Sequence, residues 1–208
     1  MRKQTPMEET LNAFTHGIGA LLGITGLILL LIFQTNKTSY SLFSVMVYGL
    51  TLIILFSAST LYHWVKNEKW KHYFRILDHI SIYLLIAGTY TPVALIVLKD
   101  SLGWELFWIE WSITFLGIFL KLFFTGRFEF FSVLLYLVLG WLIVFDFSAL
   151  SEAIGSGGVL WLFAGGLCYT LGIVFYALER IPYSHVIWHL FVLGGAICHY
   201  FLILFYII

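Results

Sequence analysis

The chain has 208 residues, of which 61% are hydrophobic and 11% are charged, and its formal net charge is zero. Soluble domains carry about 25% charged residues, so this composition excludes an ordinary soluble protein and indicates an integral membrane protein. The sequence has no basic cluster, which argues against a nucleic-acid partner, because proteins bind nucleic acids chiefly by neutralising phosphates.

Seven apolar segments are each long enough to cross a bilayer, which takes about 20 residues. In chain order they cover residues 17–33, 41–63, 76–98, 105–123, 130–148, 157–177 and 185–207. The connections are short, so we expect an all-α membrane protein: a single domain over residues 1–208, folded as a bundle of seven transmembrane helices. Residues 1–16 would form a short cytoplasmic segment. Pro92, with Gly88 nearby, should bend the third helix.

Lysine and arginine residues gather on one side of the predicted bundle. With the N-terminus inside, nine of them are cytoplasmic, whereas Lys37 and Lys99 are outside. The nine are Arg2, Lys3, Lys66, Lys69, Lys71, Arg75, Lys121, Arg127 and Arg180. Basic residues are enriched in cytoplasmic loops, so we expect the N-terminus inside and the C-terminus outside, in the cell inner (plasma) membrane.

Four polar residues lie near the cytoplasmic ends of three predicted helices. His63 ends the second helix, Asp78 begins the third, and His185 and His189 begin the seventh. Ionisable residues inside a bilayer are costly and generally face the interior of a bundle, so each of these is a candidate functional residue.

Two of these residues, His185 and His189, are four positions apart and therefore share one helix face, which is a spacing for two ligands of one ion. With His63 they would form a three-histidine site near the cytoplasmic leaflet, and neutral imidazoles suit Zn²⁺. Iron, copper and nickel also accept imidazole ligands. A single histidine in a bundle is more often a hydrogen-bonded core residue, and only the shared depth of the polar residues favours the metal site.

The residues beside this site have several open roles. Ser59 precedes His63 by four positions, so its hydroxyl lies on the same face, where it could bond a substrate carbonyl or its own helix backbone. Asp78 could act as a general base, orient an imidazole, or complement the dipole of its own helix. The spacing does not separate these roles.

A polar face also marks the start of the chain. Glu9, Asn12 and His16 are spaced i, i+3, i+7, so they share one face of a helix that enters the first span. They could cover the same site, or they could cap the helix at the membrane interface.

Other polar residues are expected to lie away from the metal site. His199 is roughly 21 Å along the last helix from its first histidine, at about 1.5 Å per residue, so we expect a hydrogen-bonded histidine that lines a polar cavity in the outer half. Glu110 and Asp146 are expected to extend toward the interface. We expect His72 and His79 to be interfacial residues.

Four segments together carry a family resemblance: EETLNAFTHGIG at residues 8–19, SASTLYH at 57–63, LDHISIYLLIAGTYTP at 77–92 and SHVIWHLFVLGGAICHY at 184–200. Along nearly the whole chain they resemble the bacterial hemolysin III branch of the progestin and adipoQ receptor family. The resemblance implies an inner-leaflet zinc ion held by three histidines, which match His63, His185 and His189. Ser59 and Asp78 match the family's other polar positions beside the metal.

Relatives in that superfamily, the adiponectin receptors and alkaline ceramidases, are associated with zinc-dependent hydrolysis of lipid amides. The resemblance therefore implies a role in membrane lipid homeostasis and a hydrolase of lipid amides or esters, with a membrane lipid as substrate and with Ser59 and Asp78 as catalytic residues. A non-catalytic sensor of membrane state with a structural zinc, and a pore-forming haemolysin, stay open as alternatives. Only 16 residues precede the first predicted span, so no protein hormone is expected as a partner.

Overall fold

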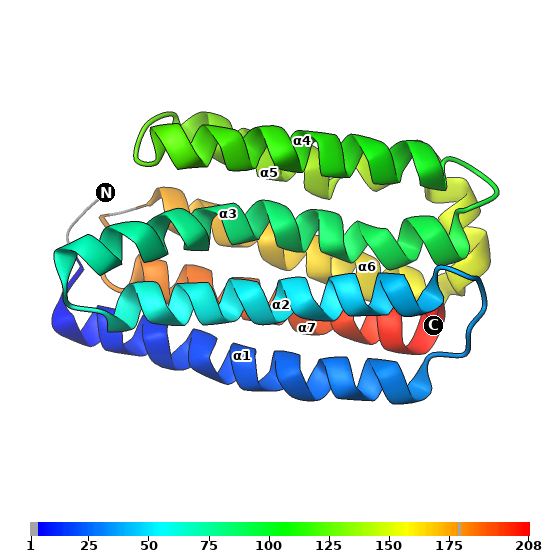
Figure 1. Cartoon of the computed structure of the whole chain (residues 1–208), viewed down its shortest axis with the longest axis horizontal. Coiled ribbons are helices and arrows are strands. Elements are labelled where there is room, and N and C mark those ends of the chain that lie inside the picture. The colour runs from blue at the N-terminus through cyan, green and yellow to red at the C-terminus, as the bar shows by residue number, and fades with distance from the viewer. Residues whose placement is uncertain (1–3, 179) are drawn as a thin grey trace.

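The computed structural model describes residues 4–178 and 180–208, so Arg2 and Lys3, which contributed to the predicted orientation, lie outside the described residues. The described chain is largely helical and contains no β-strand. Figure 1 shows the helices running side by side along one long axis, with the start of α1 and the end of the last helix at opposite ends of the bundle. We call the end where the first helix begins the N end, and the other the C end.

The helices follow the chain in this order: α1 (Pro6–Phe33), α2 (Ser41–Trp64), α3 (Glu68–Pro92), the π-helix η1 (Val93–Val97), α4 (Gly103–Phe124), α5 (Glu129–Gly140), the 3₁₀-helix η2 (Leu142–Asp146), α6 (Phe147–Ala177), α7 (Ser184–Leu202) and the π-helix η3 (Ile203–Ile207). The most extensive packing joins α1 to α2, α2 to α3, and α6 to α7.

The first helix begins well before the predicted boundary at residue 17. Its start is fixed by a capping box, in which the Thr5 hydroxyl accepts from the Glu8 amide and the Glu8 carboxylate accepts from the Thr5 amide. Pro6 occupies the first helical position, where its missing N–H costs nothing. Most of the segment expected to precede the first span is therefore part of α1.

Pro92, which was expected to bend the third helix, is the last residue of α3. α3 stops at Pro92 and the chain continues as the π-helix η1. Proline has no amide hydrogen and its ring crowds the preceding turn, so the regular hydrogen-bond pattern cannot pass through it.

Within the described residues, six segments are long and apolar enough to cross a membrane. One of them, Glu129–Ala177, has 49 residues, which as a straight helix would measure about 74 Å, whereas the bilayer core is about 30 Å thick. The segment is broken twice, first where α5 ends at Gly140 and again at Gly155, whose φ of 62° and ψ of −178° are not helical and suit glycine alone. In Figure 1 the chain reaches the C end along α5 and returns along α6.

A tyrosine satisfies the backbone at the first of these breaks. The Tyr90 hydroxyl donates to the Gly140 carbonyl at 3.2 Å and accepts from the Ile143 amide at 2.8 Å. Backbone groups freed inside a bilayer must find partners within the protein. The contact therefore allows α5 to pass into η2 within the apolar region.

The distribution of side chains is that of a membrane protein. Large apolar residues face outward, with Phe130 83% and Phe145 73% exposed, whereas many polar side chains are buried between the helices. This arrangement places apolar groups against lipid and polar groups in the interior, and it supports an integral membrane protein.

Candidate metal centre

Three histidines from two helices meet at the N end of the bundle. His63 lies in the last turn of α2, and His185 and His189 lie in the first turns of α7. Their ring centroids are 4.7 to 5.3 Å apart, and one nitrogen from each ring lies within 4.8 Å of the other two. The structure thus brings together the three residues that the sequence selected, and this group could hold a metal ion.

Two of the rings present a nitrogen that has no protein partner. His63 Nε2 and His189 Nδ1 are buried and have no hydrogen-bond partner among the residues that the structure describes. Buried polar atoms are nearly always satisfied, so these two nitrogens are available to bind a ligand such as a metal ion. Neutral imidazole nitrogens are common ligands of zinc and other transition metals.

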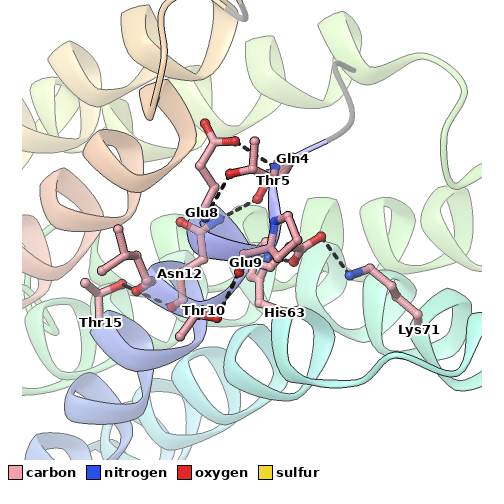
Figure 2. A network of polar contacts seen from close by, with 11 residues as sticks. Gln4, Thr5, Glu8, Glu9, Thr10, Asn12, Thr15, His63 and Lys71 are labelled. Carbon is pink, nitrogen blue, oxygen red and sulfur yellow. Dashed lines mark hydrogen bonds and ion pairs between the residues drawn. The ribbon is translucent and has the colours of Figure 1, made fainter.

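The polar face of α1 lies against this group, and Figure 2 shows its Glu9 beside His63. Glu9 Oε2 is 2.7 Å from His63 Nδ1, and the fully buried Asn12 has its backbone close to the His189 side chain. His16 stacks on His189, with centroids 3.7 Å apart and planes 15° from parallel. Of the two arrangements left open by the sequence, the structure shows the one in which this face covers the site.

The two predicted catalytic residues lie beside the histidines. Ser59 is buried one turn before His63, and its hydroxyl lies near the Asp78 carboxylate. Asp78 is half-buried on α3 and lies close to both Ser59 and His63. The residues that the sequence placed at one depth therefore do lie together.

A cavity connects this region to the middle of the bundle. Ser59, Asp78, His185 and His189 line it near the N end, and His199 lines it farther along. The remaining lining is mostly aliphatic and aromatic, and includes Ile82, Leu85, Ile86, Tyr90, Trp141, Ile173 and Val192. The arrangement can hold a molecule with a polar group at the histidines and an apolar portion directed away from them.

His199 is hydrogen-bonded and lines a cavity, as expected, because its Nε2 lies 3.2 Å from the Leu162 carbonyl oxygen, but that cavity is mostly apolar and not polar. The expectation for Glu110 is wrong. Glu110 is completely buried, and neither carboxylate oxygen has a partner among the described residues. Asp146 accepts from the Ser101 hydroxyl and the Leu102 amide, which binds the loop before α4 to η2. The Glu110 side chain points toward the protein interior and does not extend to the interface, whereas no observation tests the expectation for Asp146.

A second polar cluster was missed in the sequence. Glu129 lies 2.8 Å from Nζ of Lys121, which is 1% exposed, and 3.7 Å from both Arg75 and His79. His79 is buried, not interfacial as expected, whereas His72 is exposed. Arg75 and His79 are spaced i, i+4 on α3, a pattern that could have indicated a shared partner.

Comparison with known proteins assigns the family. The family described as haemolysin-III related matches residues 4–200. The chain is 45% identical over 202 residues to hemolysin-3 of Bacillus cereus, covering 97% of this chain and 92% of that protein. It is 44% identical over 203 residues to the hemolysin-3 homolog of Bacillus subtilis (strain 168), covering 97% and 95%.

A similarity also extends to animals. The chain is 28% identical over 207 residues to the human monocyte to macrophage differentiation factor, covering 97% of this chain and 85% of that protein. No solved structure matches the chain significantly. The family match over nearly the whole chain confirms the resemblance carried by the four sequence segments, and the protein belongs to the haemolysin-III related family.

Proposed function

We propose that the protein is a zinc-dependent hydrolase of lipid amides or esters that acts in membrane lipid homeostasis in the cell inner (plasma) membrane. The observation that carries the proposal is the group formed by His63, His185 and His189, whose nitrogens lie within 4.8 Å of one another. Two of these residues also line a largely apolar cavity together with Ser59 and Asp78.

The proposed topology has seven spans, with the segment Glu129–Ala177 crossing the membrane twice and turning at Gly155. Its length, its non-helical backbone at Gly155 and the return of the chain along α6 support two crossings. An odd number of crossings places the two termini on opposite sides. The bias of lysine and arginine toward the N end supports a cytoplasmic N-terminus, so the metal centre lies near the cytoplasmic leaflet.

Zinc suits the donor set because three imidazoles are a common ligand set in catalytic zinc sites, which use three protein ligands and leave one position open. When bound, zinc would supply a Lewis acid and an ionised water near neutral pH. His63, His185 and His189 would hold it.

The chain's own residues would supply the proton transfer. In our proposal the Asp78 carboxylate removes a proton from the attacking water as the new carbon–oxygen bond forms at the substrate carbonyl. It returns the proton to the leaving nitrogen or oxygen as the old bond breaks. The Ser59 hydroxyl, which lies near Asp78, donates a hydrogen bond to the substrate carbonyl.

The apolar part of the cavity would hold the acyl portion of the substrate. A lipid amide or ester has its reactive carbonyl between a polar headgroup and a hydrocarbon chain. Aliphatic and aromatic side chains such as Leu85, Ile86 and Trp141 line the cavity beyond the polar residues. A carbonyl near Asp78 would thus direct the chain toward the middle of the bilayer.

A structural role for the metal is the second candidate. The histidines belong to α2 and α7, which both pack against α1, and an ion shared between them would link the two helices. Under this interpretation the protein senses or regulates the state of the membrane without turnover.

The test uses purified protein in liposomes that contain both amide-linked and ester-linked lipids. Metal content is measured by elemental mass spectrometry and released fatty acid by lipid mass spectrometry, for wild type, Asp78→Asn, His189→Ala and the exposed-histidine control His72→Ala. We expect zinc in all but His189→Ala, and fatty acid from wild type and His72→Ala alone. If zinc-loaded wild type cleaves neither lipid class, the structural role is favoured. If metal-free His189→Ala hydrolyses lipid at the same rate as wild type, the proposed reaction is refuted.

A further inference from the structure

The Glu9 carboxylate lies between His63 and Lys71, with one oxygen on each (Figure 2). Oε2 is 2.7 Å from His63 Nδ1, and Oε1 is 2.8 Å from Lys71 Nζ. We propose that Glu9 is a positioning residue of the metal centre, whose carboxylate fixes the His63 ring so that Nε2 is the atom presented to the ion. This inference rests on the metal site of the proposed function and does not depend on the reaction.

The contact with Glu9 determines which His63 nitrogen is free. A carboxylate paired with an ammonium can only accept hydrogen bonds, so the nitrogen that faces Glu9 must carry the proton. Nδ1 therefore donates to Oε2, and the lone pair of the neutral ring lies on Nε2. Nε2 is the buried atom for which residues 4–178 and 180–208 provide no partner. The tautomer set by Glu9 is thus the one that a metal ligand requires.

Lys71 fixes the orientation of the Glu9 carboxylate. The side chains of Glu9 and Lys71 are each 24% exposed, so their ion pair is partly sheltered from water. The Lys71 ammonium also lies 5.2 Å from the centre of the Tyr62 ring, next to His63 in the sequence. Because each carboxylate oxygen has its own partner, from α2 and from α3, rotation of the Glu9 side chain would break both contacts.

The first turn of α1 is hydrogen-bonded to the residue that precedes α7. Glu8 Oε1 accepts from the backbone amide of Tyr183 at 2.9 Å, immediately before the helix that carries His185 and His189. Its second oxygen accepts from the Thr5 amide in the capping box. Adjacent residues of α1 therefore contact the start of α7 and the end of α2. This places the Glu9 backbone at a defined position relative to both ligand-bearing helices.

The expected consequence is a loss of metal affinity without loss of the fold. Removing a partner of a metal-binding histidine costs about 10-fold to 100-fold in metal affinity. We expect a loss of that size for Glu9→Ala, measured as zinc affinity by competition with a chelator. Glu9→Gln should lose less, because its side-chain oxygen can still accept from Nδ1 while the charge is gone. The matched control is Glu152→Ala, which removes an exposed carboxylate of α6.

Two further measurements separate positioning from a merely structural role. The visible absorption of bound Co²⁺ reports ligand geometry, and we expect it to change in Glu9→Ala and to return toward wild type in Glu9→Gln. Thermal unfolding of the metal-free proteins should be nearly the same. If Glu9→Ala does not fold, Lys71→Met provides the test, because it releases one carboxylate oxygen and leaves Glu9 in place. We expect a smaller affinity loss and a shifted Co²⁺ spectrum.

The outcomes distinguish this role from the proposed function. If the folded Glu9→Ala protein has wild-type zinc affinity and an unchanged Co²⁺ spectrum, the positioning role is overturned and the metal centre is left intact. If Glu9→Ala does not fold, the same result in both Glu9→Gln and Lys71→Met overturns the positioning role. If the wild-type protein binds no divalent cation, both the positioning role of Glu9 and the proposed function are refuted. Wild type that binds zinc but hydrolyses no lipid would refute the reaction alone, and the affinity series would still decide the role of Glu9.

Discussion

His16 lies flat against His189, with ring centroids 3.7 Å apart and ring planes 15° from parallel. The same ring meets Phe56 edge-on at 5.0 Å, so it fills the space between α2 and α7. His16 thus supports one of the candidate ligands from α1.

Removing the stacked ring should destabilise the protein. We expect His16→Ala to lower the free energy of unfolding by about 1–3 kcal/mol, because it leaves a cavity and removes an aromatic pair. His16→Phe keeps a planar ring and should lose less. Thermal unfolding of the detergent-solubilised proteins measures both effects, and equal midpoints for His16→Ala and wild type would show that the stack contributes nothing.

Metal removal should lower the unfolding temperature reversibly. A ligand that binds only the folded state stabilises it by about 2.7 kcal/mol at a free concentration 100 times its Kd. We expect a chelator to lower the midpoint of wild type and added zinc to restore it. His185→Ala removes one of the three ligands and should respond much less, whereas His72→Ala should respond as wild type does. If neither the chelator nor added zinc changes the unfolding midpoint of wild type, metal binding is contradicted.

The sequence predicted the principal site because its residues carry local signals. His185 and His189 are one turn apart, and Ser59 and His63 are one turn apart, so helix periodicity alone places each pair on one face. The shared depth of the two pairs followed from the order of the spans. What the spacing could not show is the contact between Glu9 and His63, because it depends on how α1 packs against α2.

The fold was predictable to a similar extent. Apolar length located the spans, but the early start of α1 depends on a capping box around Thr5 and Glu8, which hydropathy does not detect. Glu110 was misplaced for a related reason. The sequence of α4 is apolar on nearly every face, so its pattern does not show which face packs against α3. Burial of the Glu110 carboxyl was therefore not expected.

A neutral replacement at Glu110 should be tolerated. The side chain is completely buried, and both of its oxygens lack a partner within the described residues, so an ionised carboxylate there would be costly. We expect Glu110→Gln, which has nearly the same shape, to change the free energy of unfolding by less than about 1 kcal/mol. Glu110→Lys should prevent stable insertion. A large loss of stability in Glu110→Gln would show that the charge itself is required.

Breaking the buried ion pair at the start of α5 should be far more damaging. Lys121 Nζ is 2.8 Å from Glu129 Oε2, and the lysine side chain is 2% exposed. Removing one partner of such a pair costs about 3–5 kcal/mol, so Lys121→Met should unfold at a much lower temperature. The exposed pair of Lys99 and Asp100 provides the control, and Lys99→Met should cost at most about 1 kcal/mol. Similar losses in the two variants would contradict a structural role for the buried pair.

The central claim is that His63, His185 and His189 share one metal ion, and X-ray absorption at the zinc edge of the purified protein tests it most directly. We predict one zinc per chain with a first shell that includes three imidazole nitrogens at about 2.0–2.1 Å. The imidazole signal should be lost in His189→Ala. A wild-type protein without stoichiometric metal, or with zinc whose first shell lacks imidazole, would contradict the account.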